Sequence, residues 1–470
     1  MKKTKIVATI GPVTENVEML EKLLQAGMNV IRLNFSHGDF NEHQRRVDFI
    51  REASKKTGLP VAILQDLGGP KIRIGNFKTE TVKLVPGNTL TITADDLPEG
   101  DETRVSVNYP NLPKEVEVGH IIFMNDGRNK LKVKEINGND VVCEILIGGE
   151  IKGRRGLNLP DSDLTVKSLT EKDIADLEFG IKNKVDYMAL SFVRRPEDVM
   201  DLRKILDERG CDAGIISKIE TPQAVANIDK IIELSDGIMV ARGDLAIEVP
   251  FEKVPSIQKM IIQKCNEAGK PVITATQMME SMIKNPVATR AEVSDVANAI
   301  IDGTDAIMLS EETTLGNHPF EAVNVMSRVA LEVEKDFAYH LVSDEPLVTD
   351  EVHATDRVLS SASVHIAEGV EAKAIVVVSD DISDARMVSR FKASMPIVVA
   401  TSDEREFNKL VLSWSVYPIL IKKTGVFDDA MKEAKEKATS LDFLTHGDTV
   451  VFFGAEDMKS PAHTLTVEKL

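Results

Sequence analysis

Eight short apolar runs, rich in β-branched residues, recur between residues 5 and 310 of this 470-residue chain. They are KIVATI, NVIRLNF, PVAILQD, VDYMALSF, AGIISKIE, DGIMVARG, PVITATQ and TDAIMLS. Such runs are typical of parallel strands buried on both faces. Most precede stretches with apolar residues at helical spacing, such as residues 17–26, 196–208 and 254–268. Eight strand–helix units predict an α/β fold, a closed (β/α)8 or TIM barrel, with reactive residues at the carboxyl ends of its strands.

Two regions depart from this regular alternation. Stretches such as TVKLVPGNTLTIT and KLKVKEINGNDVVCEILIGG alternate apolar and polar residues and contain Gly, Pro and Asn, which predicts an inserted small β-barrel lid domain. AKAIVVVSD, MPIVVATS, VYPILIKK and DTVVFFGA, with a helical pattern at 428–438, predict a C-terminal α/β domain for regulation or assembly. The predicted divisions are barrel 1–68, lid 69–165, barrel 166–341 and C-terminal domain 342–470.

Composition narrows the function classes. The chain is 43% apolar and carries a net charge of −18, which argues against nucleic-acid binding because that normally needs a basic face. Three cysteines, far apart, predict neither a disulfide framework nor a zinc site, and they fit a reducing, cytoplasmic location. No run approaches the roughly 20 apolar residues of a membrane span, so we expect no membrane association.

The strand ends carry charged and polar residues at successive positions. Lys218 and Glu220 are two apart in IISKIE, so in a strand they share one face. Asp244 ends the next run and Thr276 the one after it. Glu220 and Asp244 could share Mg²⁺, an ion that prefers oxygen ligands, while Lys218 could neutralise a phosphoryl group. This set predicts a metal-assisted site for an anionic substrate.

Further polar residues fall at the other strand ends. Arg32 and Arg73 offer fork-shaped donors for phosphate or carboxylate, and Gly243 allows a close approach of the backbone to a ligand. The remaining residues of this set are Asn34, Ser36, His37, Asp66, Lys71, Arg242, Glu311 and Glu312.

Each of these features has a commoner structural interpretation when taken alone. A Lys-x-Glu pair at a strand end is usually a surface ion pair, and the acids of SEET could merely stabilise a helix N-terminus. His43 is expected to be a solvated helix residue. The recurrence of such groups at strand ends, and not at strand starts, favours a functional site. There is no P-loop and no G-x-G-x-x-G turn, so any nucleotide would be held by arginines, a metal and the lid.

Longer motifs run along the chain from near its start to near residue 460. They are TKIVATIGP, GMNVIRLNFSHG, QDLGGPKIR, GLNLP, SLTEKD, SFVR, ISKIE, DGIMVARGDLA, TATQMMESM and NPVATRAEVSDVANAI. In these motifs and in their order the chain resembles the pyruvate kinase family. The resemblance implies a barrel with a β-barrel lid and a C-terminal α/β domain. It also implies phosphoryl transfer from phosphoenolpyruvate to ADP, giving pyruvate and ATP in the last step of glycolysis. Mg²⁺ or Mn²⁺, potassium and a cytoplasmic, allosteric homotetramer belong to the same expectation.

The resemblance also implies a role for each matching residue. Lys218 would stabilise the transferring phosphoryl group, and Thr276 would lie near the proton that reaches enolpyruvate. The metal Mg²⁺ would be held by Glu220 and Asp244. Phosphoenolpyruvate would be bound by Arg32, Gly243, Asp244 and Thr276, and the nucleotide by Asn34, His37 and Arg73. Ser191 would support the site. A monovalent cation would be bound by Asn34, Ser36, Asp66 and the Leu67 backbone.

Two departures from the family pattern carry predictions. Potassium-dependent members usually have Glu in GPEIR, whereas this chain has Lys71 in GPKIR, whose ammonium could replace the cation and make potassium dispensable. The stretch SDDISDA, residues 379–385, lacks the glycine of sugar-phosphate loops and holds Asp380, Asp381 and Asp384. Ionised carboxylates repel phosphate, and the tail loop is GAEDMKSPAH, so we expect little response to fructose bisphosphate.

Three functions remain in competition at the level of sequence. The first is an active pyruvate kinase. The second is a lyase or aldolase that stabilises an enolate without a nucleotide, against which the lid and Arg73 argue. The third is a catalytically silent sensor or assembly protein, against which the intact Lys218, Glu220, Asp244 and Thr276 argue.

Overall fold

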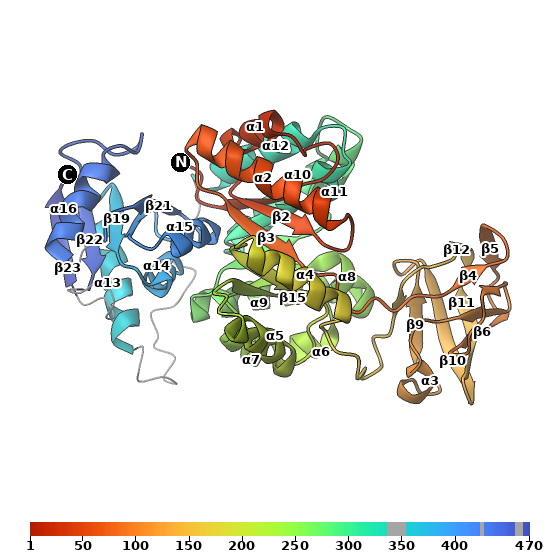
Figure 1. Cartoon of the computed structure of the whole chain (residues 1–470). Coiled ribbons are helices and arrows are strands. Elements are labelled where there is room, and N and C mark those ends of the chain that lie inside the picture. Colours follow the sequence, from red (N-terminus) through yellow and green to blue (C-terminus); the bar gives the residue numbers. More distant parts are fainter. Residues whose placement is uncertain (336–353, 424–426, 456–463) are drawn as a thin grey trace.

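The structure is a computed structural model that describes residues 1–335, 354–423, 427–455 and 464–470. Three bodies lie in a row (Figure 1), with the helix-covered barrel in the middle. A β-rich domain lies beyond one end of the barrel and an α/β domain beyond the other.

The central body is a closed barrel of eight parallel strands, as predicted from the sequence. Its strands follow the order β1-β18-β17-β16-β15-β14-β3-β2 around the ring. They are β1 (Lys5–Thr9), β2 (Val30–Asn34), β3 (Ala62–Asp66), β14 (Tyr187–Leu190), β15 (Gly214–Ile219), β16 (Gly237–Ala241), β17 (Val272–Ala275) and β18 (Ala306–Leu309). Almost every strand residue is buried, which explains why the runs are apolar without alternation.

Helices surround the barrel on its outside (Figure 1). They are α1 (Val17–Gln25), α2 (Phe40–Thr57), α4 (Glu171–Lys182), α5 (Pro196–Glu208), α6 (Pro222–Ala226), α7 (Ile228–Leu234), α8 (Arg242–Glu248), α9 (Val254–Ala268), α10 (Arg290–Ile301), α11 (Glu311–Thr314) and α12 (Pro319–Val333), with short 3₁₀ turns at Phe251–Lys253 and Glu280–Ile283. Capping boxes fix where several begin: Asp39 caps α2, Thr170 caps α4 and Thr289 caps α10. The caps place these helix starts just beyond the carboxyl ends of the strands.

The inserted domain follows β3 and is built from short strands around its own core. They are β4 (Asn76–Phe77), β5 (Thr81–Leu84), β6 (Thr89–Thr93), β7 (Glu99–Gly100), β8 (Arg104–Ser106), β9 (Ile121–Met124), β10 (Asn129–Asn137), β11 (Asp140–Ile147), β12 (Gly149–Lys152) and β13 (Leu157–Asn158), with helix α3 (Leu112–Glu115). Six of them form one sheet in the order β13-β9-β10-β11-β6-β8. Alternation of buried and exposed residues along β10 and β11 matches the pattern read from the sequence.

The C-terminal domain has a five-stranded sheet in the order β21-β20-β19-β22-β23. Its elements are α13 (Ala354–Gly369), β19 (Ala374–Val378), α14 (Ile382–Ser389), β20 (Ile397–Thr401), α15 (Glu404–Lys409), a 3₁₀ turn (Leu410–Leu412), β21 (Val416–Leu420), α16 (Phe427–Ala438), β22 (Thr449–Gly454) and β23 (Thr464–Lys469). The antiparallel edge strand β23 was not predicted, because its half-exposed TLTVEK sequence lacks the apolar run of the other four. The predicted boundary at 341/342 lies outside the described residues, and those at 68/69 and 165/166 stay predictions.

The C-terminal domain closes the amino end of the barrel. Val411 and Leu412 pack in one core with inward-facing barrel residues such as Val7 and Met239. Across the same boundary, Lys392 forms a buried 2.8 Å ion pair with Asp305. The barrel therefore has one end buried against a domain and one end left for the lid.

Among the described residues, no helix has the length and apolar character needed to cross a membrane.

Candidate active site

A buried lysine forms the centre of the carboxyl-end rim. Lys218 lies near the carboxyl end of β15, and its ammonium donates to Ser191 Oγ at 2.7 Å. It lies 2.9 Å from Glu220 Oε1 and 3.4 Å from Asp66 Oδ1. Burial would lower the pKa of Lys218, but Asp66 and Glu220 outweigh burial and raise it. The lysine thus stays charged in a site that excludes much of the surrounding water.

Two carboxylates flank this lysine. Glu220 Oε2 accepts the Phe192 backbone N–H at 2.7 Å, while the buried Oε1 has no hydrogen-bond partner despite its closeness to Lys218. Burial and the negative charge of Glu220 raise the pKa of Asp244 to about 6. A carboxylate pair with a buried oxygen that accepts no hydrogen bond, and with mutual repulsion, fits a hard divalent cation, with water and substrate oxygens as its other ligands.

Within the described residues, no group of three or more His, Cys, Asp or Glu side chains is arranged to hold a metal ion. A pair of protein carboxylates is nonetheless a common way to hold Mg²⁺ beside substrate phosphates. The fit of Glu220 and Asp244 to a metal therefore assumes that the substrate supplies further oxygens.

Thr276 and Gly243 meet at the ends of β17 and β16. The Gly243 backbone N–H donates to Thr276 Oγ1 at 2.7 Å, and that hydroxyl donates to Ala275 O at 2.6 Å. Thr276 has a φ of 71°, a left-handed conformation that is costly for a β-branched residue and typical of functional sites. The two residues that the sequence placed together at the rim are in direct contact.

Arg242 holds this strained turn and does not point to the substrate face. Its Nη2 donates to Thr276 O at 2.8 Å, and it forms a two-pronged ion pair with Asp295 at 2.7 Å. Asp295, on α10, is a supporting residue that sequence reasoning missed. It lies within a quoted motif, but nothing in a helical stretch of mixed polarity indicates which acid turns inward.

Arg32 is buried and fixed in place by two partners. Its Nε donates to Asp66 Oδ2 at 2.6 Å, and Nη1 donates to Thr9 Oγ1 at 2.9 Å. Burial favours the neutral acid, yet Lys218 and Arg32 together hold the pKa of Asp66 below its ordinary value. Asp66 is thus shared between the two cations of the rim. Ser191 Oγ donates to Leu67 O at 2.7 Å and links the same group to the next backbone position.

Lys71 lies where the sequence places the monovalent-cation ligands. Its ammonium donates to Ser36 Oγ at 2.8 Å, and the Ser36 N–H donates to Asn34 Oδ1 at 3.1 Å. Burial, Arg73 and Lys218 lower the pKa of Lys71, whereas Asp244 and Asp66 raise it. This lysine is half-buried among the charges of the rim, so it is not freely solvated.

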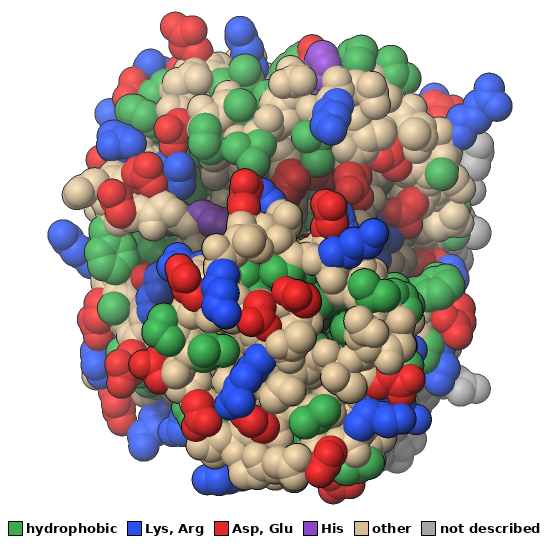
Figure 2. All heavy atoms as spheres, turned by 90° about the vertical axis from the view of Figure 1, so that its right-hand side faces the viewer, with side chains coloured by type: hydrophobic (Ala, Val, Ile, Leu, Met, Phe, Trp, Pro, Cys, Tyr) green, Lys and Arg blue, Asp and Glu red, His purple; other side chains and the backbone are tan. Residues whose placement is uncertain are grey.

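A cleft of about 250 Å³ separates the rim from the lid. Its lining includes Lys71, Arg73, Arg155, Asn158 and Asp244. The lid contacts the barrel there, since Asn158 Nδ2 donates to Glu248 Oε1 at 2.8 Å. On the face turned toward the viewer in Figure 2, acidic and basic side chains are interspersed without a large patch of one sign. The concentration of cations is therefore a property of the cleft and not of this outer face.

The exposed His37 lies at the edge of this cationic group. Burial, Lys71 and Arg73 lower its pKa. Of the two acids that follow β18, Glu312 is buried and accepts the backbone N–H groups of Met279 and Ser310. Glu312 therefore stabilises local structure, as the simpler interpretation of SEET predicted.

The expectation that His43 is solvated was wrong. The ring is 1% exposed and stacks on Phe35, with centroids 3.9 Å apart. Its Nε2 lies 2.9 Å from His37 O, to which the N–H donates. Helix α2 folds back over the turn after β2, and the sequence alone does not reveal this contact. His43 thereby fixes the turn that carries Asn34, Ser36 and His37.

A parallel barrel whose rim gathers a buried lysine, an arginine and paired carboxylates is typical of enzymes that act on anionic substrates with a metal. Comparison with known proteins identifies the family within this class of enzymes. The family model described as the pyruvate kinase barrel domain matches residues 1–323, and that described as the pyruvate kinase alpha/beta domain matches residues 357–468.

Individual relatives agree with these models. A pyruvate kinase of Clostridium acetobutylicum is 43% identical over 96% of this chain and 95% of its own length. One of Staphylococcus aureus is 44% identical over 96% of this chain and 77% of its own. A crystal structure of a pyruvate kinase from Cryptosporidium parvum covers 100% of this chain and 96% of its own, with a TM-score of 0.93 and 37% identity. The chain belongs to the pyruvate kinase family, whose members are phosphotransferases.

Proposed function

We propose that this protein transfers the phosphoryl group of phosphoenolpyruvate to ADP, giving pyruvate and ATP in the final step of glycolysis. The observation that carries the proposal is the charged, buried Lys218 beside Asp66 and Glu220 at the rim, next to Asp244. Phosphoryl transfer needs positioning and fixed charge more than covalent chemistry, and this rim supplies both.

The roles assigned to the rim follow from its contacts. Lys218 neutralises charge on the phosphoryl group as it leaves phosphoenolpyruvate, because its ammonium is held in place by Ser191 and Glu220. Arg32 and the Gly243 backbone orient phosphoenolpyruvate. Glu220 and Asp244 would hold Mg²⁺ or Mn²⁺, which when bound neutralises substrate oxygens.

Thr276 lies near the point where enolpyruvate gains its proton. Its hydroxyl already donates to Ala275 O and accepts from Gly243, so a proton is better relayed through water that contacts this hydroxyl. Thr276 then serves mainly to orient the substrate and that water. Arg242 and Asp295 keep its strained backbone in place.

The nucleotide is bound by Asn34, His37 and Arg73 at one side of the cleft. The depressed pKa of His37, caused by burial and by Lys71 and Arg73, keeps the ring neutral at pH 7. A neutral ring can contact the nucleotide while the arginine and lysines neutralise its phosphates. The lid contact between Asn158 and Glu248 closes the cleft on the other side.

Lys71 makes potassium dispensable in this proposal. Its ammonium is bonded to Ser36, one of the expected cation ligands, and acts electrostatically on Asp66. A fixed ammonium there supplies the single positive charge that a potassium ion would bring. The other expected ligands, Asn34 and the Leu67 carbonyl, are engaged with Ser36 and Ser191.

We also propose little response to fructose bisphosphate. The acids of SDDISDA are already engaged: Asp381 caps α14, Asp380 accepts from Ser402 just after β20, and Asp384 accepts from Ser379 Oγ. They present negative charge where a phosphate would need donors. Of the tail loop GAEDMKSPAH, residues 456–463 lie outside the described residues. A cytoplasmic homotetramer remains part of the proposal.

The test is to follow pyruvate and ATP formed from phosphoenolpyruvate and ADP with Mg²⁺. We expect equal amounts of the two products, and no product when ADP is left out or the metal is chelated. Pyruvate formed without ADP would mean that the phosphoryl group passes to water, and it would contradict transfer to ADP. A folded protein with no turnover would favour a sensor or assembly role.

A further inference from the structure

The turn between β2 and α2 carries three side chains to which ligand-binding roles are proposed. Asn34 ends β2, and Ser36 and His37 follow it in the turn. Inside the turn, the Ser36 N–H donates to Asn34 Oδ1 at 3.1 Å and the His37 N–H donates to Asn34 O at 3.3 Å. These two bonds engage N–H groups of the turn, so the carbonyl oxygens that follow Asn34 depend on donors from elsewhere.

Two side chains from the surrounding helices supply these donors. His43, on α2, donates its Nε2–H to His37 O at 2.9 Å. Lys172, on α4, donates to Phe35 O at 2.8 Å, and its ammonium is also paired with Asp176 at 2.6 Å. The backbone of the turn is therefore anchored at two points by helices from different parts of the chain.

The imidazole of His43 is fixed in one orientation and one tautomer. The residue is 1% exposed, and its ring is parallel to that of Phe35, with 8° between the planes. Because a carbonyl oxygen only accepts, Nε2 carries the proton, and Nδ1 of the neutral ring carries none. Among the described residues, Nδ1 has no hydrogen-bond partner, and burial lowers the pKa of His43. The neutral ring thus has one donor, and the turn uses it.

Gly38 allows α2 to approach the turn so closely. Its φ is 81°, and a Cβ at this position would lie 2.8 Å from Glu42 Oε2 and 3.3 Å from His43 Nε2. Asp39 then caps α2, and Glu42 completes the capping box. The chain therefore reverses within a few residues and brings His43 back onto the carbonyl of the turn.

We propose that His43 is a positioning residue for the nucleotide. Its Nε2–H holds His37 O and so determines where the side chains of Asn34 and His37 meet the nucleotide. The hydrogen bond carries this role more than the ring stack, because the bond acts on the backbone of His37 itself, whereas Phe35 also packs against Phe179. This inference rests on the proposed function, which supplies the nucleotide.

Two substitutions of His43 separate the hydrogen bond from the stack. His43→Phe keeps an aromatic ring beside Phe35 and removes the N–H donor. His43→Gln removes the ring and keeps an amide N–H about as far from the backbone as Nε2. For each whole protein we would measure the Kd of ADP and the Kd of phosphoenolpyruvate by calorimetry with Mg²⁺, and the Tm by scanning calorimetry.

The two variants should differ in opposite ways. His43→Phe should raise the Kd of ADP about fivefold, as the loss of one hydrogen bond predicts, and change that of phosphoenolpyruvate less than about twofold. In the assay of turnover, the KM of ADP should rise while kcat changes less than about twofold. His43→Gln should keep the Kd of ADP within about twofold while its Tm falls, because the ring stack is lost. A merely structural role would make the affinity follow the Tm.

Lys172→Met tests the second anchor and serves if His43→Phe does not fold. We expect a smaller rise in the Kd of ADP, about threefold, because the side chain of Lys172 is 62% exposed. Lys182→Met, which changes an exposed lysine at the other end of α4, is the matched control and should bind ADP normally.

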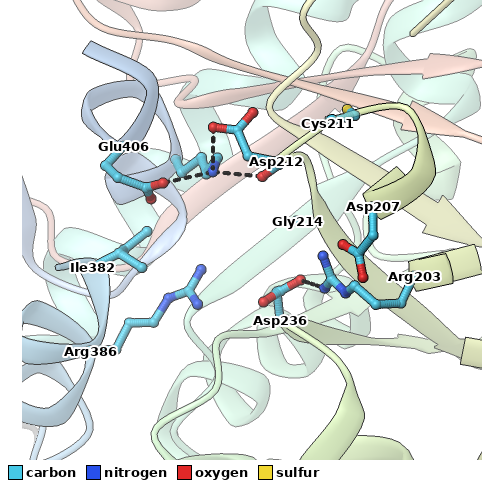
Figure 3. A pocket seen from close by; sticks show the side chains of 11 residues that line it. Arg203, Asp207, Cys211, Asp212, Gly214, Asp236, Ile382, Arg386 and Glu406 are labelled. Atoms are coloured by element: carbon cyan, nitrogen blue, oxygen red, sulfur yellow. Dashed lines mark hydrogen bonds and ion pairs between the residues drawn. The ribbon is translucent and has the colours of Figure 1, made fainter. Parts of the chain in front are cut away.

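Arg203→Gln is the control for a loss of stability elsewhere. Arg203 forms an ion pair with Asp236 in the cavity between the barrel and the C-terminal domain (Figure 3). This pair lies at the amino end of the barrel, whereas the turn follows the carboxyl end of β2. The variant should have a lower Tm and an unchanged Kd of ADP.

Two results would overturn the inference alone. They are a Kd of ADP that is unchanged in both His43→Phe and Lys172→Met, and a rise in His43→Gln as large as that in His43→Phe. Absence of ADP binding by the unmodified protein would contradict the proposed function as well, so the two failures are distinguishable.

Discussion

Two buried lysines at opposite ends of the same barrel have opposite electrostatics. Lys218, at the carboxyl end, has two carboxylates within 3.4 Å, and its pKa is raised. Lys5, at the amino end, is 2% exposed, donates to Val416 O and lies over the Tyr417 ring. Burial and the charge of Lys2 lower its pKa to about 7 despite Glu334 and Asp305.

The opposite pKa shifts of Lys218 and Lys5 show how the two ends of the barrel treat a buried positive charge. Burial costs a lysine its charge unless acids stand close enough to compensate. At the rim they do, and a fixed positive charge is available for chemistry. At the base the lysine packs between domains and can become neutral. The same residue type, buried in both places, thus gives a charged group at one end and a packing group that can lose its charge at the other.

The largest effect is expected from a substitution in the carboxylate pair of the rim, Glu220 and Asp244. Asp244→Asn removes the charge of one of the two proposed metal ligands, so we expect the apparent affinity for Mn²⁺ to fall on the order of 100-fold, with a matching loss of turnover at limiting metal. Metal binding is measured by calorimetry on the folded variant. Asp207→Asn, on α5 and outside the lining of the cleft at the rim, is the control and should bind metal normally. Unchanged affinity in Asp244→Asn would remove this carboxylate from the metal site.

Lys71→Glu reverses one charge of the rim and so tests whether the positive charge there is needed for turnover. We expect the variant to need potassium, with turnover rising at least about tenfold when potassium replaces an inert cation at constant ionic strength, because the site then lacks its ammonium. The unmodified protein should change less than about twofold. Lys184→Glu provides a control away from the cleft. Strong potassium activation of the unmodified protein would contradict the role given to Lys71.

Acid pH should weaken metal binding at the rim. Burial and Glu220 raise the pKa of Asp244 to about 6 from its ordinary 3.8, so below about pH 6 a proton competes with the metal. We expect the apparent affinity for Mn²⁺ to fall up to about tenfold per pH unit there. Without metal, the folded state binds more protons than the unfolded chain between these two values, so stability falls as pH rises through that window. A pH-independent metal affinity would be inconsistent with this assignment.

The smallest effect on activity is expected at the base of the barrel. Lys5→Met should leave turnover within about twofold. Since the pKa of Lys5 is about 7 when folded and 10.5 ordinarily, the unfolded chain binds more protons in that range, and stability rises with pH there. The variant should lose part of this rise, as measured by denaturant unfolding at several pH values. An equal slope in both proteins would mean that Lys5 is not the titrating group.

The sequence predicts most of the fold because each strand type leaves its own pattern. Barrel strands buried on both faces, such as Ile215–Ile219, are continuous apolar runs, whereas β10 and β11 alternate. Strand β23 was not predicted, because an edge strand needs neither a continuous apolar run nor strict alternation. Domain contacts such as Lys392 with Asp305 are also invisible in sequence, since they join segments far apart in the chain.

The candidate site is predictable where residues end successive strands, because the barrel brings those ends together. Lys218, Glu220 and Ser191 meet for this reason. Residues that act from the outer helices are not predictable in this way. Asp295 reaches Arg242 from α10, and His43 reaches the turn after β2 from α2, and neither lies at a strand end.

The most direct test of the account compares Lys218→Met with Lys5→Met in one assay of pyruvate formation from phosphoenolpyruvate, ADP and Mg²⁺. Both variants remove a buried ammonium, and circular dichroism checks that both fold. The account predicts that Lys218→Met loses turnover on the order of 1,000-fold, while Lys5→Met stays within about twofold of the unmodified protein. Similar turnover in the two variants would contradict it, because the charge kept at the rim would then not perform the chemistry.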